Sequence, residues 1–173
     1  MRARRQPGVW AATIAVAALA GVPAAASGGD VRPLQARGDR LLAEGLRASP
    51  SLAALVAELR ASDVVVYVDL DPEEPGPYSG ALRFRGAAAG VRYLHVWLAC
   101  RRVDAAIIAT LAHELYHAAE VARVPTVGSA EAFTAFYRSI GRLQRPGCYE
   151  TDAAQATTAR VRRELEQAAA RRQ

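Results

Sequence analysis

The segment from His113 to His117 reads H-E-L-Y-H and combines residue types that suit metal chemistry. Residues four apart on an α-helix lie on one face, so the His113 and His117 imidazoles can reach the same Zn²⁺ ion. Glu114 is rotated by about 100° around the helix axis from His113. It can therefore lie beside the metal without binding it, where a general base for a zinc-bound water is needed. This spacing predicts a zinc site with Glu114 as the catalytic residue.

The motif resembles the H-E-x-x-H of the zincin metallopeptidases. The metzincin pattern is absent, because A-A-E-V-A-R follows His117 and Met1 is the only methionine, which excludes a Met-turn. A catalytic zinc usually has three protein ligands plus water. Similarity to the gluzincins implies that the third ligand is a carboxylate from a later element. The resemblance implies a metallopeptidase that hydrolyses peptide or protein substrates with a zinc-bound water activated by Glu114.

Two acidic residues near the motif are weaker ligand candidates. Glu120 lies on the histidine face, about 5 Å further along the helix axis than His117. That position suits a hydrogen bond to an imidazole N–H or an ion pair with an arginine better than metal ligation, although Glu120 stays the alternative ligand. Glu131 lies about 200° from Phe133 on its own helix and is expected to be a solvated charge.

Glu150 is the predicted third ligand. It begins the last predicted helix and lies within about 60° of that helix's apolar stripe, so its carboxylate is expected to point inward. Asp152 points the opposite way, as a charge at the helix N-terminus. The E-T-D-A that starts at Glu150 resembles the E-x-x-A-D segment of several gluzincin families, with Ala154 in place of their aspartate. An exposed carboxylate favoured by the helix dipole is the alternative for Glu150.

Residues 1–26 are predicted to be a secretory signal peptide. Residues 1–5 are basic, residues 9–22 are apolar, and an A-x-A site precedes Ser27. The apolar stretch is short for a membrane span, which needs roughly 20 residues, so an uncleaved anchor is the alternative. We expect residues 27–173 to form a single exported domain, periplasmic or secreted, without a stable membrane span after cleavage.

Export changes the interpretation of Cys100 and Cys148. In an oxidising compartment they are a candidate disulfide, and two separate buried thiols are the alternative. The bond would join the strand end before the motif helix to the residue two before Glu150.

The charge balance gives no case for nucleic-acid binding. The whole chain carries +5, and residues 1–26 hold three arginines and no acid, so their removal leaves +2. No basic run with interleaved aromatic residues is present. The sequence does not indicate an oligomeric state.

The pattern of apolar residues predicts an α+β fold with a small, mostly antiparallel sheet packed against helices. Helices are expected at 34–48, 52–60, 103–122, 129–141 and from 150 to the C-terminus, and strands at 64–70, 81–85 and 91–99. The two later strands are expected to form a hairpin. The layout resembles a minimal zincin core, in which a short sheet precedes the helix that bears H-E-x-x-H.

Other polar residues have weaker signals. His95 lies beside Tyr93 and Trp97 on one strand face, where it borders a cleft or is simply a packed or surface histidine. Three tyrosines are candidate hydrogen-bond donors to an oxyanion, namely Tyr116, Tyr137 and Tyr149.

Two further function classes stay open beside the zinc metallopeptidase. One is a non-catalytic exported module that binds metal or a partner on a zincin-like core. The other is a structural domain without metal.

Overall fold

Secondary structure is described for residues 28–72 and 79–172 of the computed structural model, so the predicted signal peptide lies outside the described residues. The elements, in chain order, are β1 (Asp30–Pro33), α1 (Ala36–Ala48), α2 (Pro50–Arg60), β2 (Val64–Asp71), β3 (Gly80–Ala88), β4 (Val91–Ala99), α3 (Asp104–Ala122), α4 (Ala130–Ile140), β5 (Arg142–Arg145), β6 (Cys148–Glu150) and α5 (Asp152–Ala170). Within this part of the chain, no helix has the length and apolar character to cross a membrane.

The main sheet has the strand order β1-β2-β4-β3, and with the surrounding helices it confirms the predicted α+β class. The expectation of a mostly antiparallel sheet was wrong. β2 pairs in parallel with both β1 and β4, and only β3 and β4 form the predicted antiparallel hairpin. The parallel pairs arise because α1 and α2 connect β1 to β2, and because β4 returns between β2 and β3. The short strand β1 was not predicted.

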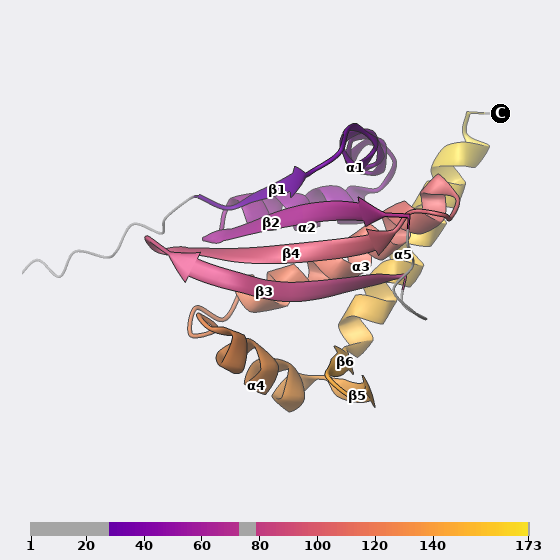
Figure 1. Cartoon of the computed structure of the whole chain (residues 1–173). Helices are drawn as coiled ribbons and strands as arrows, with labels where there is room; N and C mark the ends of the chain where they lie inside the picture. The colour runs from indigo at the N-terminus through magenta and orange to yellow at the C-terminus, as the bar shows by residue number, and fades with distance from the viewer. Residues whose placement is uncertain (1–27, 73–78, 173) are drawn as a thin grey trace, which may run out of the picture.

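The helices cover one face of the sheet (Figure 1). In β4, Leu94, Val96 and Leu98 are buried against them, while the alternate residues are partly exposed on the other face, as the alternation predicted. Helix α3 is buried around most of its circumference, because it packs against the sheet and α2 and also against α5. Its central position explains why so many of its residues are small or apolar.

The C-terminal part differs from the prediction near Glu150. The segment 142–150, expected to be mostly loop, forms the β5–β6 hairpin. Helix α5 begins at Asp152, and Thr151 is its N-cap, with its side chain accepting a hydrogen bond from Ala154 N. Glu150 therefore ends a strand and does not begin the helix. Helix α4 starts after its N-cap, Ser129, whose side chain accepts a hydrogen bond from Ala132 N.

The two cysteines are not joined in a disulfide. Cys100 follows β4 beside α1, where its carbonyl accepts a hydrogen bond from Arg37 Nη1 at 2.9 Å. Cys148 belongs to β6 and lines the cavity described below. The alternative of two separate thiols is what the structure has, with each cysteine partly buried.

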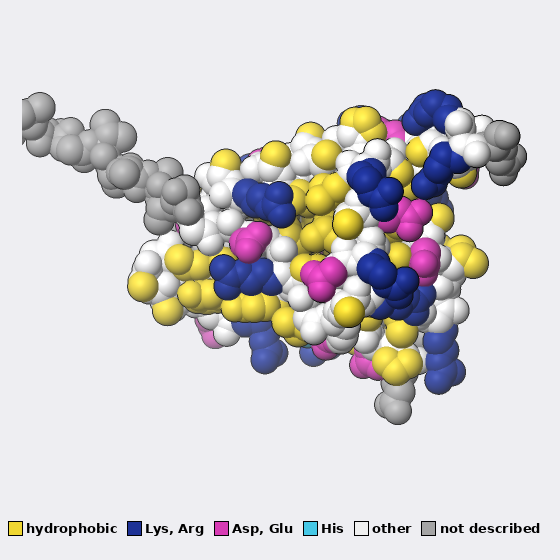
Figure 2. Space-filling view, turned by 90° about the horizontal axis from the view of Figure 1, so that it is seen from above, with side chains coloured by type: hydrophobic (Ala, Val, Ile, Leu, Met, Phe, Trp, Pro, Cys, Tyr) yellow, Lys and Arg dark blue, Asp and Glu magenta, His cyan; other side chains and the backbone are white. Residues whose placement is uncertain are grey.

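The face of the molecule seen from above carries interspersed arginine and acidic side chains around an apolar hollow (Figure 2). Charges of opposite sign lie next to one another across this face.

Candidate metal centre

The fold brings His113, His117 and Glu150 together. His113 Nε2 lies 3.2 Å from Glu150 Oε2, and His117 Nε2 lies 3.5 Å from Glu150 Oε1. One ligand atom from each of the three residues lies within 4.8 Å of the others. The histidines occupy successive turns of α3, and the β5–β6 hairpin carries Glu150 to them. The three side chains that the sequence indicated as ligands thus face one point.

Glu120 holds the outer nitrogen of His117. His117 Nδ1 lies 2.8 Å from Glu120 Oε2, and Glu120 Oε1 accepts a hydrogen bond of 2.8 Å from Thr151 Oγ1. Because a carboxylate accepts only, the imidazole N–H is on Nδ1. Glu120 is buried and lies outside the three-residue group, in the position that the helical spacing predicted.

Thr158 holds the outer nitrogen of His113 in the same way. His113 Nδ1 lies 2.8 Å from Thr158 Oγ1, and this hydroxyl donates its own proton to Ala154 O at 3.0 Å. The hydroxyl oxygen must therefore accept from Nδ1–H. Both imidazoles thus carry a proton on Nδ1 and turn Nε2 toward Glu150.

The donor set fits a zinc ion. Two imidazole nitrogens and one carboxylate form a known catalytic zinc set, which keeps a fourth position for water. In the protein without metal, burial disfavours the charged form of Glu150, but hydrogen bonds to His113 and His117 outweigh it and lower its pKa to about 2. Burial likewise opposes protonation of His117, yet hydrogen bonds to Glu120 and Glu150 raise its pKa to about 9. The carboxylates thus favour a positive charge at this point.

Glu114 lies beside the ligands and is 6% exposed. Burial raises the pKa of its carboxyl group, and the nearby His113 and His117 partly counter that effect. The side chain packs against Gly80 of β3, where an added Cβ would lie 2.9 Å from Glu114 Oε1. A carboxylate with a raised pKa is better matched to general-base work near neutral pH than a solvated one.

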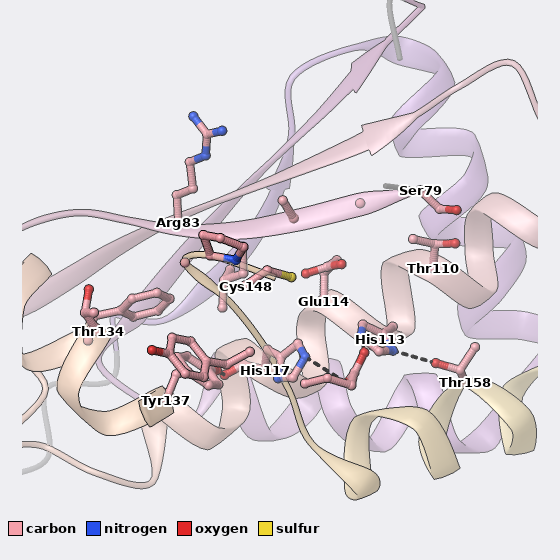
Figure 3. Close-up of a pocket in the computed structure, with 18 of the residues that line it drawn as sticks. Ser79, Arg83, Thr110, His113, Glu114, His117, Thr134, Tyr137, Cys148 and Thr158 are labelled. Atoms are coloured by element: carbon pink, nitrogen blue, oxygen red, sulfur yellow. Dashed lines mark hydrogen bonds and ion pairs between the residues drawn. The ribbon is translucent and has the colours of Figure 1, made fainter. Parts of the chain in front are cut away.

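These residues line an open cavity of about 550 Å³ between β3, α3, α4, the β5–β6 hairpin and α5. Thr134 and Tyr137 lie on one side of the histidines, and Ser79, Thr110 and Thr158 lie on the other (Figure 3). The candidate ligands and Glu114 are therefore open to solvent through this cavity, and different residues line its two ends.

The three candidate tyrosines have different surroundings. Tyr137 lines the cavity, but its hydroxyl donates a hydrogen bond of 2.7 Å to His117 O, and its ring meets the His117 ring edge-on. Tyr149 also lines the cavity. Tyr116 instead packs under the guanidinium of Arg123, 5.2 Å from the ring centroid. Tyr137 therefore supports the motif helix, and of the three only Tyr137 and Tyr149 border the cleft.

Other polar residues from the sequence lie away from the ligands. His95 is on the sheet face opposite α3, with Nε2 3.8 Å from Asp69 Oδ2, and burial lowers its pKa. Glu131 is exposed in the first turn of α4, as expected. Asp152 pairs with Arg142 across the base of the hairpin. None of these three lines the cavity.

Thr151, Thr158 and Gly80 were not predicted to take part in the site. A threonine before a helix is a recognisable N-cap, so Thr151 had a local signal, but its bond to Glu120 had none. Thr158 and Gly80 depend on contacts between segments far apart in the chain. No sequence pattern distinguishes them from other threonines and loop glycines.

Known proteins give no guide to the function, so the function is argued from the side chains of this site. No protein-family model, curated protein or solved structure matches the chain.

Proposed function

We propose that the protein is a zinc-dependent metallopeptidase in which His113, His117 and Glu150 hold the ion and Glu114 is the general base. The observation that carries the proposal is the convergence of two Nε2 atoms and one carboxylate in an open cavity, beside a buried glutamate. A structural domain without metal would have no need to bury this combination, because buried charges are costly unless they serve a partner.

In the proposed hydrolysis the metal ion and the protein side chains have different roles. Held by His113, His117 and Glu150, a zinc ion would lower the pKa of a bound water molecule and would polarise a carbonyl oxygen. Glu114 accepts the proton of the attacking water and returns it to the leaving amine. Its raised pKa serves both steps, because the carboxyl group must first take a proton and then release it. Glu120 and Thr158 keep the imidazole rings oriented through their Nδ1 atoms.

A peptide is the substrate class that the cavity wall favours. Residues 79–83, at the start of β3, form one side of the cavity. In the described chain β3 is an edge strand of its sheet, paired only with β4. An edge strand offers N–H and C=O groups to an extended chain, so a peptide can add to it and pass beside Glu114.

The experiment that tests the proposal is metal analysis combined with peptide turnover on the purified protein. We expect one zinc per chain and cleavage of a mixed peptide library. Glu114→Gln should retain zinc and lose turnover, whereas Glu150→Ala should lose zinc. Full zinc occupancy in Glu150→Ala would remove Glu150 from the ligand set. Zinc without any turnover in the wild-type protein would favour the non-catalytic binding module.

We also propose that the protein is exported, on the strength of its N-terminal sequence. N-terminal sequencing of the protein recovered outside the cytoplasm should begin at Ser27. An intact Met1 on the mature protein would contradict cleavage.

A further inference from the structure

Helix α5 passes along the candidate ligands with successive turns. Thr151 bonds to Glu120, and Thr158 bonds to His113, so α5 runs antiparallel to α3. The next turn of the same α5 face brings Arg162, four residues after Thr158, to the end of the cavity that Thr110 also lines.

The guanidinium of Arg162 is available to a ligand. It is exposed at the cavity wall and has no hydrogen-bond or ion-pair partner in the described part of the chain. By contrast, Arg37, Arg92 and Arg123 each bind a carboxylate of the protein. The other arginine at the cavity, Arg83, directs its side chain away from the candidate ligands (Figure 3). Among the described residues, Arg162 therefore has no side chain to which it is tied.

The opposite end of the cavity is lined mainly by aromatic and apolar side chains from α4, β3 and β6, with the hydroxyl of Thr134 beside them: Phe133, Tyr137, Leu82 and Tyr149. The cleft thus has an apolar end and a cationic end, on either side of the candidate metal ligands. A guanidinium matches a carboxylate with two parallel hydrogen bonds, which an ammonium cannot do.

We propose that Arg162 is a specificity-determining residue that selects peptides with a carboxylate on the α5 side of the scissile bond and an apolar side chain on the other. The inference rests on the proposed function for the peptide nature of the ligand. Arg162 lies about 6 Å along α5 from Thr158, and an extended chain advances about 3.3–3.6 Å per residue. The carboxylate therefore lies about two residues from the scissile bond, on an Asp or Glu side chain or at the peptide C-terminus.

Binding to the zinc-loaded Glu114→Gln protein tests the inference without turnover. Fluorescence anisotropy would compare peptides that carry Glu or Gln at each position around an aromatic residue, each as a free acid and as a C-terminal amide. We expect about tenfold tighter binding for the carboxylate form. A difference between Glu and Gln identifies a side-chain carboxylate, and a difference between acid and amide identifies the C-terminus.

Three added substitutions decide whether Arg162 is responsible. Arg162→Ala should abolish the preference, and Arg162→Glu should reverse it toward Lys-containing peptides. Arg162→Lys should keep only part of it, because the forked geometry is lost. Arg163→Ala is the matched control, since Arg163 is exposed on the same helix but does not line the cavity. Added salt should reduce the preference of the parent protein.

The outcomes separate this inference from the peptidase proposal. Equal binding of charged and neutral peptides, or an unchanged preference in Arg162→Ala, overturns the role of Arg162. If binding depends on Arg162 but the protein with Glu114 cleaves no peptide, the recognition stands and the peptidase proposal fails. If peptides are cleaved without any charge preference, the peptidase proposal stands and the role of Arg162 is overturned.

Discussion

Gly80 of the edge strand lies directly against the Glu114 side chain. A methyl group on Gly80 would lie 2.9 Å from Glu114 Oε1 and 3.1 Å from Glu114 Cγ. The same methyl would meet Thr110 Cγ2 at 2.9 Å. The absence of a side chain at residue 80 is therefore what lets β3 approach α3 closely enough to enclose the proposed general base.

Gly80→Ala should reduce catalysis without removing zinc. The added methyl group must displace Glu114 or β3, and a misplacement of about 1 Å in a catalytic group can cost about 100-fold in rate. We expect kcat to fall by about 10- to 100-fold, with zinc stoichiometry unchanged. Gly128→Ala is the control, because an added Cβ at Gly128 meets nothing within 4 Å. Equal kcat in the two variants would show that this contact does not position Glu114.

Thr158→Val should weaken zinc binding, because it removes the acceptor that orients His113. Loss of a hydrogen bond to a metal-binding histidine typically costs about 10- to 100-fold in affinity. Competition with a chromogenic chelator measures this loss. Thr157→Val provides a close control, since Thr157 makes the same kind of backbone hydrogen bond, to Ala153 O at 2.9 Å, but does not line the cavity. Unchanged affinity in Thr158→Val would contradict the orienting role.

The stability of the protein stripped of metal should be greatest between about pH 4.5 and pH 6.5. The pKa of His117 rises from 6.5 to about 9 on folding, so its contribution is complete below 6.5 and is lost as the pH rises through 9. The pKa of Glu150 falls from 4.5 to about 2, so its contribution is present above 4.5 and is lost as the pH falls through 2. Thermal unfolding with a chelator from about pH 2 to about pH 9 measures the loss of stability on the acid side and on the alkaline side. His117→Gln should reduce the loss of stability on the alkaline side. If that loss is unchanged in the variant, His117 is not its cause.

Zinc should bind more tightly as the pH rises. His117 must lose its proton to offer Nε2, so the zinc affinity should fall by about tenfold per pH unit below its pKa of about 9. The increase in Tm caused by zinc should therefore be larger at pH 8 than at pH 6. A zinc-induced shift that does not depend on pH would contradict a protonated His117 in the protein without metal.

Arg92 should be a major source of stability at the C-terminal end of the motif helix. It is 3% exposed, and it bonds both carboxylate oxygens of Asp63, at 2.8 and 2.6 Å. It also donates to Val121 O at 2.7 Å and to Val124 O at 2.9 Å. Arg92→Ala leaves the Asp63 carboxylate without its cation, and removal of one partner of a buried ion pair costs about 3–5 kcal/mol. We expect about 3 kcal/mol in urea unfolding, because Asp63 is partly exposed, and less than 0.5 kcal/mol for the exposed Arg85→Ala.

Much of the motif helix could be predicted because helical geometry is local. Spacings of three and four residues set the shared face of His113 and His117 and placed Glu120 within reach of the His117 ring. The alternation of β4 likewise identified its buried face. These features depend on the repeat of a single element, which does not change with the elements around it.

Glu150 shows where local periodicity stops being sufficient. Its inward direction was inferred from the face of a helix, yet it lies at the end of β6, and α5 begins two residues later. The carboxylate reaches both histidines because the β5–β6 hairpin places residue 150 beside them. The parallel pairing of β2 with β4 was also beyond the sequence, since strand neighbours are set by chain crossings and not by alternation.

The sequence by itself determined which residues share the metal-facing side of one helix, because that depends on 3.6 residues per turn. Only the tertiary structure decided that Gly80 admits Glu114, that Thr158 orients His113 and that Arg162 stands at one end of the cleft. Each of these contacts joins segments far apart in the chain, and their approach is set by how the sheet, α3 and α5 pack together.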